Sequence, residues 1–146
     1  MVISKDFKEF IKSLNEHKVR YLVIGGYAVA FHGHPRYTKD LDVWVSMDSN
    51  NIRNLIQALH DFGLSSLQLT EEDFQDPETI VQLGYPPNRI DLLVSIKGVG
   101  FDECYRSKQT YTIEGTKIDF IDLENLRKNK LATGRHQDLA DLEKLR

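Results

Sequence analysis

The sequence has a single cysteine, no internal repeat and no low-complexity run. That cysteine, Cys104, stands alone among 146 residues, so an intramolecular disulfide is excluded. The apolar fraction of 40% is typical of an ordinary globular protein rather than a repetitive or disordered one. At this length we expect one domain, spanning residues 1–146.

Long apolar segments and a strong charge of one sign are also missing. The N-terminal stretch M-V-I-S-K-D-F-K-E-F-I-K is charged throughout and lacks the apolar core of a signal peptide. No segment is long and apolar enough to cross a bilayer, so we expect a cytoplasmic protein without a membrane partner. The formal charge of -3 does not predict a nucleic-acid partner, although basic residues gather between Arg127 and Arg135.

Apolar residues recur at spacings that predict helices alternating with short strands. Ser4 is a candidate cap for a first helix running to about Lys18, and Ser49 for a third helix ending before Gly63. Further helical segments are expected at 27–31, within 70–77, at 101–106 and, twice, after Asp122. Strands are expected at 21–24, 41–45, 79–83, 89–95, 111–113 and 117–120. The pattern indicates an α+β, or mixed α/β, domain with one sheet covered by helices.

Two aspartates stand at the head of the apolar strand 41–45. Aspartate is depleted in strands, yet Asp40 and Asp42 flank Leu41 here. Because side chains alternate along a strand, both carboxylates should point to the same face. Two like charges so close repel unless a cation lies between them, and oxygen-rich sites suit Mg²⁺ or Mn²⁺. The alternative is that both carboxylates are simply solvated at the first turn of the strand.

A third carboxylate, Asp91, interrupts the apolar strand R-I-D-L-L-V-S. If this strand neighbours the one that carries Asp40 and Asp42, three carboxylates converge, as a two-metal phosphoryl-transfer site requires. The alternative is that Asp91 pairs with Arg89, or another basic residue, at an edge of the sheet.

Gly25 and Gly26 follow the first predicted strand and precede a short helix. Such a turn presents unpaired backbone N–H groups where no Cβ blocks a phosphate. A glycine pair alone is a weak signal and is often only a tight turn. Its position before the paired aspartates favours a phosphate site.

Together these motifs resemble the minimal nucleotidyltransferase superfamily, which includes DNA polymerase beta-like enzymes. Its pattern is a Gly-Gly turn, an acid-x-acid pair on the next strand and a third acid on a later strand. Gly25-Gly26-Tyr27-Ala28 and the stretch R-Y-T-K-D-L-D, residues 36–42, are similar to the AbiEii/AbiGii toxin-like branch. The C-terminal K-L-A-T-G-R-H-Q-D-L-A-D-L, residues 130–142, is similar to the closing segment of that branch.

The chain departs from this branch in two ways. Gln137 stands where the branch usually has a lysine before Asp138, which removes one expected phosphate or nucleic-acid contact. The additional C-terminal helical region of longer members is also lacking, so no acceptor-binding surface is carried over from them.

The resemblance implies a twisted mixed sheet flanked by helices and a nucleotidyl-transfer reaction. A nucleoside monophosphate would pass from an NTP to an acceptor hydroxyl with release of pyrophosphate, and the metal would be Mg²⁺ or Mn²⁺. The implied metal and catalytic residues are Asp40, Asp42 and Asp91, with Asp91 helping to activate the acceptor oxygen. The implied nucleotide-binding residues are Gly25, Gly26, Arg36, Thr38, Lys130 and Arg135.

Several alternatives stay open at this point. Arg36 could be a solvated loop residue, Lys130 could complement a helix end, and Arg135 could simply pair with Asp138. The acceptor could be RNA such as a tRNA, a protein or a small molecule, within or outside a toxin–antitoxin pair. The domain could instead act mainly through protein contact. A phosphohydrolase of the haloacid dehalogenase type, which also begins with D-x-D, is disfavoured because V-W-V continues the strand. His32 and His34 are expected to be loop residues rather than metal ligands.

Overall fold

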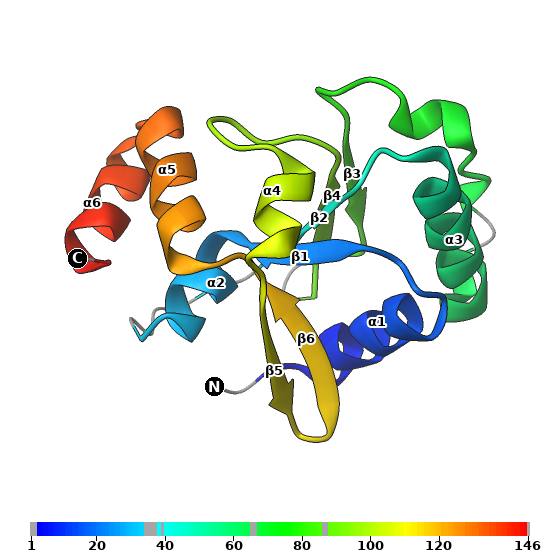
Figure 1. Cartoon of the computed structure of the whole chain (residues 1–146). Helices are drawn as coiled ribbons and strands as arrows, with labels where there is room; N and C mark the ends of the chain where they lie inside the picture. Colours follow the sequence, from blue (N-terminus) through cyan, green and yellow to red (C-terminus); the bar gives the residue numbers. More distant parts are fainter. Residues whose placement is uncertain (1–2, 34–37, 39, 65–66, 86–87, 146) are drawn as a thin grey trace.

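The fold is a mixed six-stranded sheet with helices packed on it, seen in a computed structural model (Figure 1). The structure describes residues 3–33, 38, 40–64, 67–85 and 88–145. The sheet has the order β3-β4-β2-β1-β6-β5. Its strands are β1 (Tyr21–Ile24), β2 (Leu41–Val45), β3 (Ile80–Leu83), β4 (Ile90–Leu93), β5 (Gln109–Ile113) and β6 (Thr116–Phe120). The predicted twisted, mixed sheet flanked by helices is confirmed, and the six predicted strands all occur with ends shifted by at most one or two residues.

The helices gather at two sides of the sheet. In Figure 1, α1 and α3 lie together at one side of the molecule, and α5 and α6 lie at the other. The helices are α1 (Lys5–Glu16), α2 (Gly25–Phe31), α3 (Ser49–Leu59), α4 (Phe101–Arg106), α5 (Leu123–Thr133) and α6 (His136–Lys144). Two short helical segments, η1 (His60–Leu64) and η3 (Glu71–Phe74), follow α3.

Polar caps fix where the helices begin. Ser4 accepts a hydrogen bond from the Phe7 amide at the start of α1, as predicted. The predicted cap of α3 was wrong by one residue, because Asp48, and not Ser49, accepts from the Asn51 amide. An aspartate caps as well as a serine does, so sequence preference could not separate the two neighbours.

Aromatic contacts anchor helices to the sheet. The rings of Phe31 and Phe120 stack with centroids 4.1 Å apart, which joins α2 to β6. Trp44 of β2 meets Phe101 of α4 edge to face at 5.1 Å. Because side chains alternate along β2, this contact places α4 over the face to which Asp42 also belongs. The helix α4 therefore covers part of the sheet face that carries Asp42.

Cys104 is fully buried within α4. Burial raises the pKa of its thiol to about 11, which makes it an inert core residue. No helix in the described ranges is both long and apolar enough to cross a membrane.

Candidate functional site

Three neighbouring strands bring the glycine turn and two of the aspartates to the same level of the sheet. β2 runs parallel to β4 with Asp42 opposite Asp91. On its other side β2 runs antiparallel to β1, where Asp42 faces Ile24, the residue before Gly25. The strands that carry Asp42 and Asp91 are therefore neighbours, as the sequence-based prediction required for the carboxylates to meet.

Gly25 packs directly against the Asp42 carboxylate. A Cβ built on Gly25 would lie 2.2 Å from Asp42 Oδ2, closer than any real contact. Gly25 also has φ +67°, a left-handed conformation that disfavours any side chain. Glycine is thus required here for two independent reasons. The turn belongs to α2 itself, which begins at Gly25, two residues earlier than predicted.

Arg89 bridges Asp40 and Asp91. Its Nε and Nη2 atoms each donate to a carboxylate oxygen of Asp91 at 3.1 Å. Its Nη2 atom also lies 2.8 Å from Asp40 Oδ2. The sequence alternative that Asp91 pairs with Arg89 is therefore correct, but not at a sheet edge, because β4 lies between β3 and β2. Asp40 and Asp91 are thus joined through Arg89 and not around a shared metal position.

The carboxylates still hold more negative charge than Arg89 balances. Burial, together with the charges of Asp91 and Asp40, raises the pKa of Asp42 to about 6. Asp40 Oδ1 is buried and, within the described part of the chain, has no hydrogen-bond partner. A repelling pair beside an orphaned oxygen is a site that another cation would stabilise.

The donor set suits a hard divalent cation, although the carboxylates are not arranged around one. Asp40 and Asp42 offer the oxygens that Mg²⁺ and Mn²⁺ prefer, and one oxygen of Asp40 has no partner among the described residues. Among the residues with described positions, no three His, Cys, Asp or Glu side chains are grouped to hold a metal ion. Instead, the Arg89 guanidinium lies between the carboxylates of Asp40 and Asp91.

A cavity of about 490 Å³ opens in front of Asp42 and Asp91. α5, the turn after it and the segment after β4 provide its other walls. Its polar lining residues are Asp42, Asp91, Ser95, Lys97, Asn129, Lys130, Thr133, Arg135 and Asp138, beside Gly25. A cavity of this size is within the range of small-molecule sites.

Lys130 borders the cavity but is held by two buried carboxylates. Its Nζ atom lies 3.2 Å from an oxygen of Asp138 and 3.2 Å from one of Asp141. Arg135 Nε donates to Asp138 at 2.8 Å, so the ion-pair interpretation of Arg135 and Asp138 is correct as well. Burial acts to raise the pKa of Asp138, but hydrogen bonds from Arg135, Thr133 and Lys130 outweigh it and hold this pKa well below its usual range.

The other predicted residues do not line the cavity or lie outside the described ranges. Gly26 is buried and does not line the cavity. Thr38 is half-buried, and Arg36 lies outside the described residues. The His32 Nε2 atom lies 2.8 Å from the Ile121 carbonyl oxygen, which gives this ring a structural partner. His34 lies outside the described residues.

Sequence reasoning missed Lys97 and Asn129. Both line the cavity, and the Asn129 side chain donates to the Lys97 carbonyl oxygen at 2.9 Å. A signal did exist for Asn129, because it lies one helical turn beyond Asn125 and Leu126 on the buried face of α5. A polar residue on such a face needs a partner.

Comparison with solved structures found similar folds at low sequence identity. A candidate nucleotidyltransferase from Thermotoga maritima matches with a TM-score of 0.62 at 16% identity, covering 94% of this chain and 88% of that one. An antigenic nucleotidyltransferase-like protein from Paracoccidioides brasiliensis matches with a TM-score of 0.55 at 19% identity, covering 98% and 77%. These similarities concern the fold. A search of curated proteins found no match.

A comparison with family profiles tests the nucleotidyltransferase resemblance that the motifs indicated. The profile described as "Nucleotidyltransferase of unknown function (DUF6036)" matches residues 2–145, almost the whole chain. The match covers both the glycine turn with its aspartates and the α5–α6 segment. The chain therefore belongs to this nucleotidyltransferase family.

Proposed function

We propose that the cavity binds a nucleoside triphosphate together with Mg²⁺ or Mn²⁺, and that the protein transfers the nucleoside monophosphate to an acceptor hydroxyl. One observation carries the proposal: Gly25, directly after β1, meets Asp42 of β2, which lies opposite Asp91 of β4, and there is no room for a Cβ between Gly25 and Asp42. α2 begins at Gly25, and the first N–H groups of a helix lack partners within it, which suits a phosphate contact.

The residues around the cavity would divide the work between metal and phosphates. Asp40 and Asp42 would hold the metal ions, and Asp91 would complete the second metal site and orient the acceptor oxygen. Bound metal would neutralise charge on the phosphates during transfer. The backbone at Gly25 and Gly26 would hold the β- and γ-phosphates.

Cations at the opposite wall would face the leaving pyrophosphate. Arg135 has most of its side chain exposed, so it can turn toward the cavity while remaining near Asp138. Lys130 is fixed by its buried pairs and would act through its charge. Arg36 and Thr38 are proposed nucleotide contacts from the segment before Asp40.

We also propose a biological role and an acceptor class for the protein. The motifs at residues 25–28 and 36–42 support membership of the AbiEii/AbiGii toxin-like branch, and with it a role in a toxin–antitoxin pair. The acceptor would then be RNA such as a tRNA, or a protein.

A second candidate function follows from Arg89. A guanidinium that already neutralises Asp40 and Asp91 would suit a weakly active or inactive subunit that works through protein contact. In that case a stoichiometric partner protein should co-purify from the native host, equally well with Asp42→Asn as with the wild type.

Titration calorimetry with each of ATP, CTP, GTP and UTP, with and without Mg²⁺, tests the leading proposal. We expect one or more nucleotides to bind only when Mg²⁺ is present. Asp42→Asn should weaken that binding at least about tenfold, because it removes a charge-assisted ligand, roughly 1.4 kcal/mol or more.

Asp102→Asn provides the matched control for this experiment. Asp102 is an exposed carboxylate in the first turn of α4, and it does not line the cavity. Its variant should bind as the wild type does. Folded wild-type protein that binds no nucleotide under any condition would refute the transferase proposal and favour the contact subunit.

A further inference from the structure

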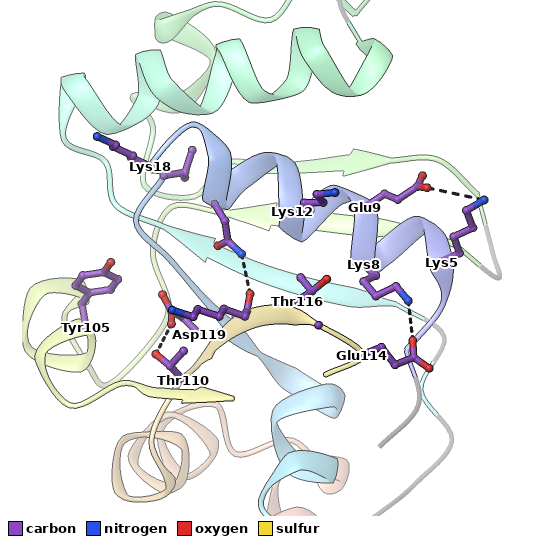
Figure 2. A pocket seen from close by; sticks show the side chains of 14 residues that line it. Lys5, Lys8, Glu9, Lys12, Lys18, Tyr105, Thr110, Glu114, Thr116 and Asp119 are labelled. Atoms are coloured by element: carbon purple, nitrogen blue, oxygen red, sulfur yellow. Dashed lines mark hydrogen bonds and ion pairs between the residues drawn. The ribbon is translucent and has the colours of Figure 1, made fainter. Parts of the chain in front are cut away.

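A second and larger hollow lies between α1 and the β5–β6 hairpin, away from the candidate site. Its volume is about 1040 Å³, and it shares no lining residue with the cavity at Asp42. Figure 2 shows α1 along one wall, the hairpin along the other, and Tyr105 at one end. We call this hollow the lysine groove.

Positive charge is concentrated in the lysine groove, although the chain as a whole carries a net charge of -3. Three carboxylates also line it, Glu9, Glu114 and Asp119. The lining lysines outnumber these carboxylates and are Lys5, Lys8, Lys12, Lys18 and Lys117. The groove is therefore a local positive patch on an acidic protein.

The carboxylates of the groove already have partners. Glu114 pairs with Lys8 at 2.7 Å, and Asp119 accepts from Thr110 at 2.5 Å. Lys5 lies 3.9 Å from Glu9. Within the described part of the chain, Lys12, Lys18 and Lys117 form no ion pair. Three ammonium groups are thus available to an external anion.

The helix fixes its lysines in a row. Lys5, Lys8 and Lys12 follow one another at spacings of three and four residues, so they share one face of α1. The opposite face, with Phe10 and Leu14, is buried in the core, and α1 cannot turn the row away. At 1.5 Å per residue the row spans about 10 Å. Lys12 of this row has no ion pair among the described residues, and Lys18 and Lys117 come from the turn after α1 and from β6, so the available ammonium groups are spread over three elements. Such a spread suits a chain of phosphates better than a single anion.

The groove has few features of a protein-binding surface. Protein interfaces are enriched in aromatic residues and depleted in lysine. The apolar lining residues here are Val19, which is buried, and Tyr105. Tyr105 is already covered, because Phe101 stacks on it at 5.4 Å and Lys108 Nζ lies 4.0 Å from its ring centroid.

An added β-strand is disfavoured as well. Along the groove side of β6, the Lys117 carbonyl oxygen accepts from the Asn15 side chain at 2.7 Å. The Asp119 amide donates to the Tyr21 hydroxyl at 3.3 Å. The backbone groups that a new strand would need are therefore engaged.

We propose that the lysine groove binds the phosphate backbone of a nucleic-acid strand, by charge and without reading its bases. This function goes beyond nucleotide transfer at the cavity. It would give the protein a second binding surface. The net charge of the whole chain does not predict this surface.

Fluorescence anisotropy with a labelled 20-nucleotide oligouridylate, and with a 20-base-pair RNA duplex, tests the proposal without NTP or metal. The test variant is Lys12→Gln, Lys18→Gln, Lys117→Gln. We expect wild-type binding that weakens with salt and a Kd at least about tenfold higher in the variant at 50 mM salt. For the single strand, the slope of log K against log salt should fall by about 2, since each lost phosphate contact contributes about 0.7.

Arg127→Gln, Lys128→Gln, Lys144→Gln is the matched control, with the same change of charge on exposed positions of α5 and α6. It should bind almost as the wild type does, and circular dichroism should show both variants folded. Equal losses in both triple variants, or no salt-dependent binding by the wild type, would overturn the proposal.

A competition with polyglutamate distinguishes nucleic acid from an acidic protein as the partner of the groove. An unlabelled 20-residue polyglutamate should displace the labelled RNA much less well than unlabelled RNA does. If the two competitors displace it equally well, the partner is an acidic protein and the assignment to nucleic acid is wrong.

The variant Asp42→Asn separates RNA binding at the groove from nucleotide binding at the cavity. It should retain full RNA binding, because the groove and the cavity share no lining residue. A failed nucleotide titration thus leaves the RNA result intact, and the reverse is also true. Loss of RNA binding in Asp42→Asn would place the RNA at the cavity and overturn the proposal.

Discussion

At the scale of single residues, the contact between Gly25 and Asp42 decides what the site can accommodate. The carboxylate occupies the space that any side chain at residue 25 would need. The sequence could predict a glycine turn before the acid pair, because both motifs are local. The contact itself depends on the antiparallel register that sets Ile24 opposite Asp42.

Gly25→Ala should separate this contact from ordinary backbone strain. Gly63 provides the control, since it also has a positive φ but a Cβ there would meet nothing within 4 Å. Gly63→Ala should lose roughly 1–2 kcal/mol of stability in urea unfolding, the cost of a left-handed backbone, and Gly25→Ala should lose more, because its Cβ also displaces the Asp42 carboxylate. Only Gly25→Ala, which forces the Asp42 carboxylate to move, should lose Mg²⁺-dependent nucleotide binding. Normal binding by Gly25→Ala would contradict the assigned role.

The role of Arg89 depends on a contact between segments that are distant in the sequence. From sequence it is one basic residue two positions before Asp91, and both share a strand face. Only the parallel pairing of β2 with β4 brings Asp40 within its reach, 49 residues away. Local patterns cannot specify a contact at that separation.

At the scale of elements, α5 and α6 form a pair held by buried charge. The first turn of α6 supplies Asp138, and α5 supplies Lys130; both side chains are almost fully buried. Spacing predicted the two helices and the Arg135–Asp138 pair. It did not predict that Lys130 would be buried, since lysine usually remains exposed.

Asp138→Ala should destabilise the protein by about 3 kcal/mol, because it leaves Lys130 buried with one carboxylate partner fewer. The pKa of Asp138 is depressed in the fold. Its contribution is therefore fully present above the ordinary carboxyl pKa and is lost progressively as the pH falls from there through the depressed pKa. In urea unfolding, the stability difference between variant and wild type should be smaller at pH 3 than at pH 7.

The control for that variant is Asp102→Ala at an exposed position of α4, which should change stability by less than about 0.5 kcal/mol at either pH. A triple variant, Lys130→Met with Asp138→Leu and Asp141→Leu, should recover most of the loss, since it removes all three buried charges. No recovery would mean that the three residues contribute more than charge compensation.

At the scale of the whole molecule, the six-stranded order places the two proposed binding surfaces apart. β1, β2 and β4 carry the cavity, whereas the β5–β6 hairpin forms a wall of the lysine groove beside α1 (Figure 1). The residues of each surface come from distant parts of the chain, so the unfolded chain has neither.

A ligand that needs the folded cavity should therefore raise the melting temperature. At a free concentration of 100 times its Kd, Mg²⁺ with the preferred NTP should add about 2.7 kcal/mol. For a chain of this length that is roughly 5–10 °C. Calorimetric melting should show this rise for the wild type and at most about half of it for Asp42→Asn, whose Kd is expected to be at least about tenfold higher. EDTA alone should leave the wild-type melting temperature unchanged, because the metal is expected to bind together with the NTP and not in its absence.

The sequence by itself determined the helices, the strands, the glycine turn and the three candidate carboxylates. Those features depend on periodicity and on residue preferences over a few positions. Tertiary structure decided which strands are neighbours, and hence the Arg89 bridge and the Gly25–Asp42 contact. It also buried Lys130 and gathered lysines from α1, its C-terminal turn and β6 into one groove. These depend on packing between distant segments, where a shift of one residue in register would turn each side chain to the other face.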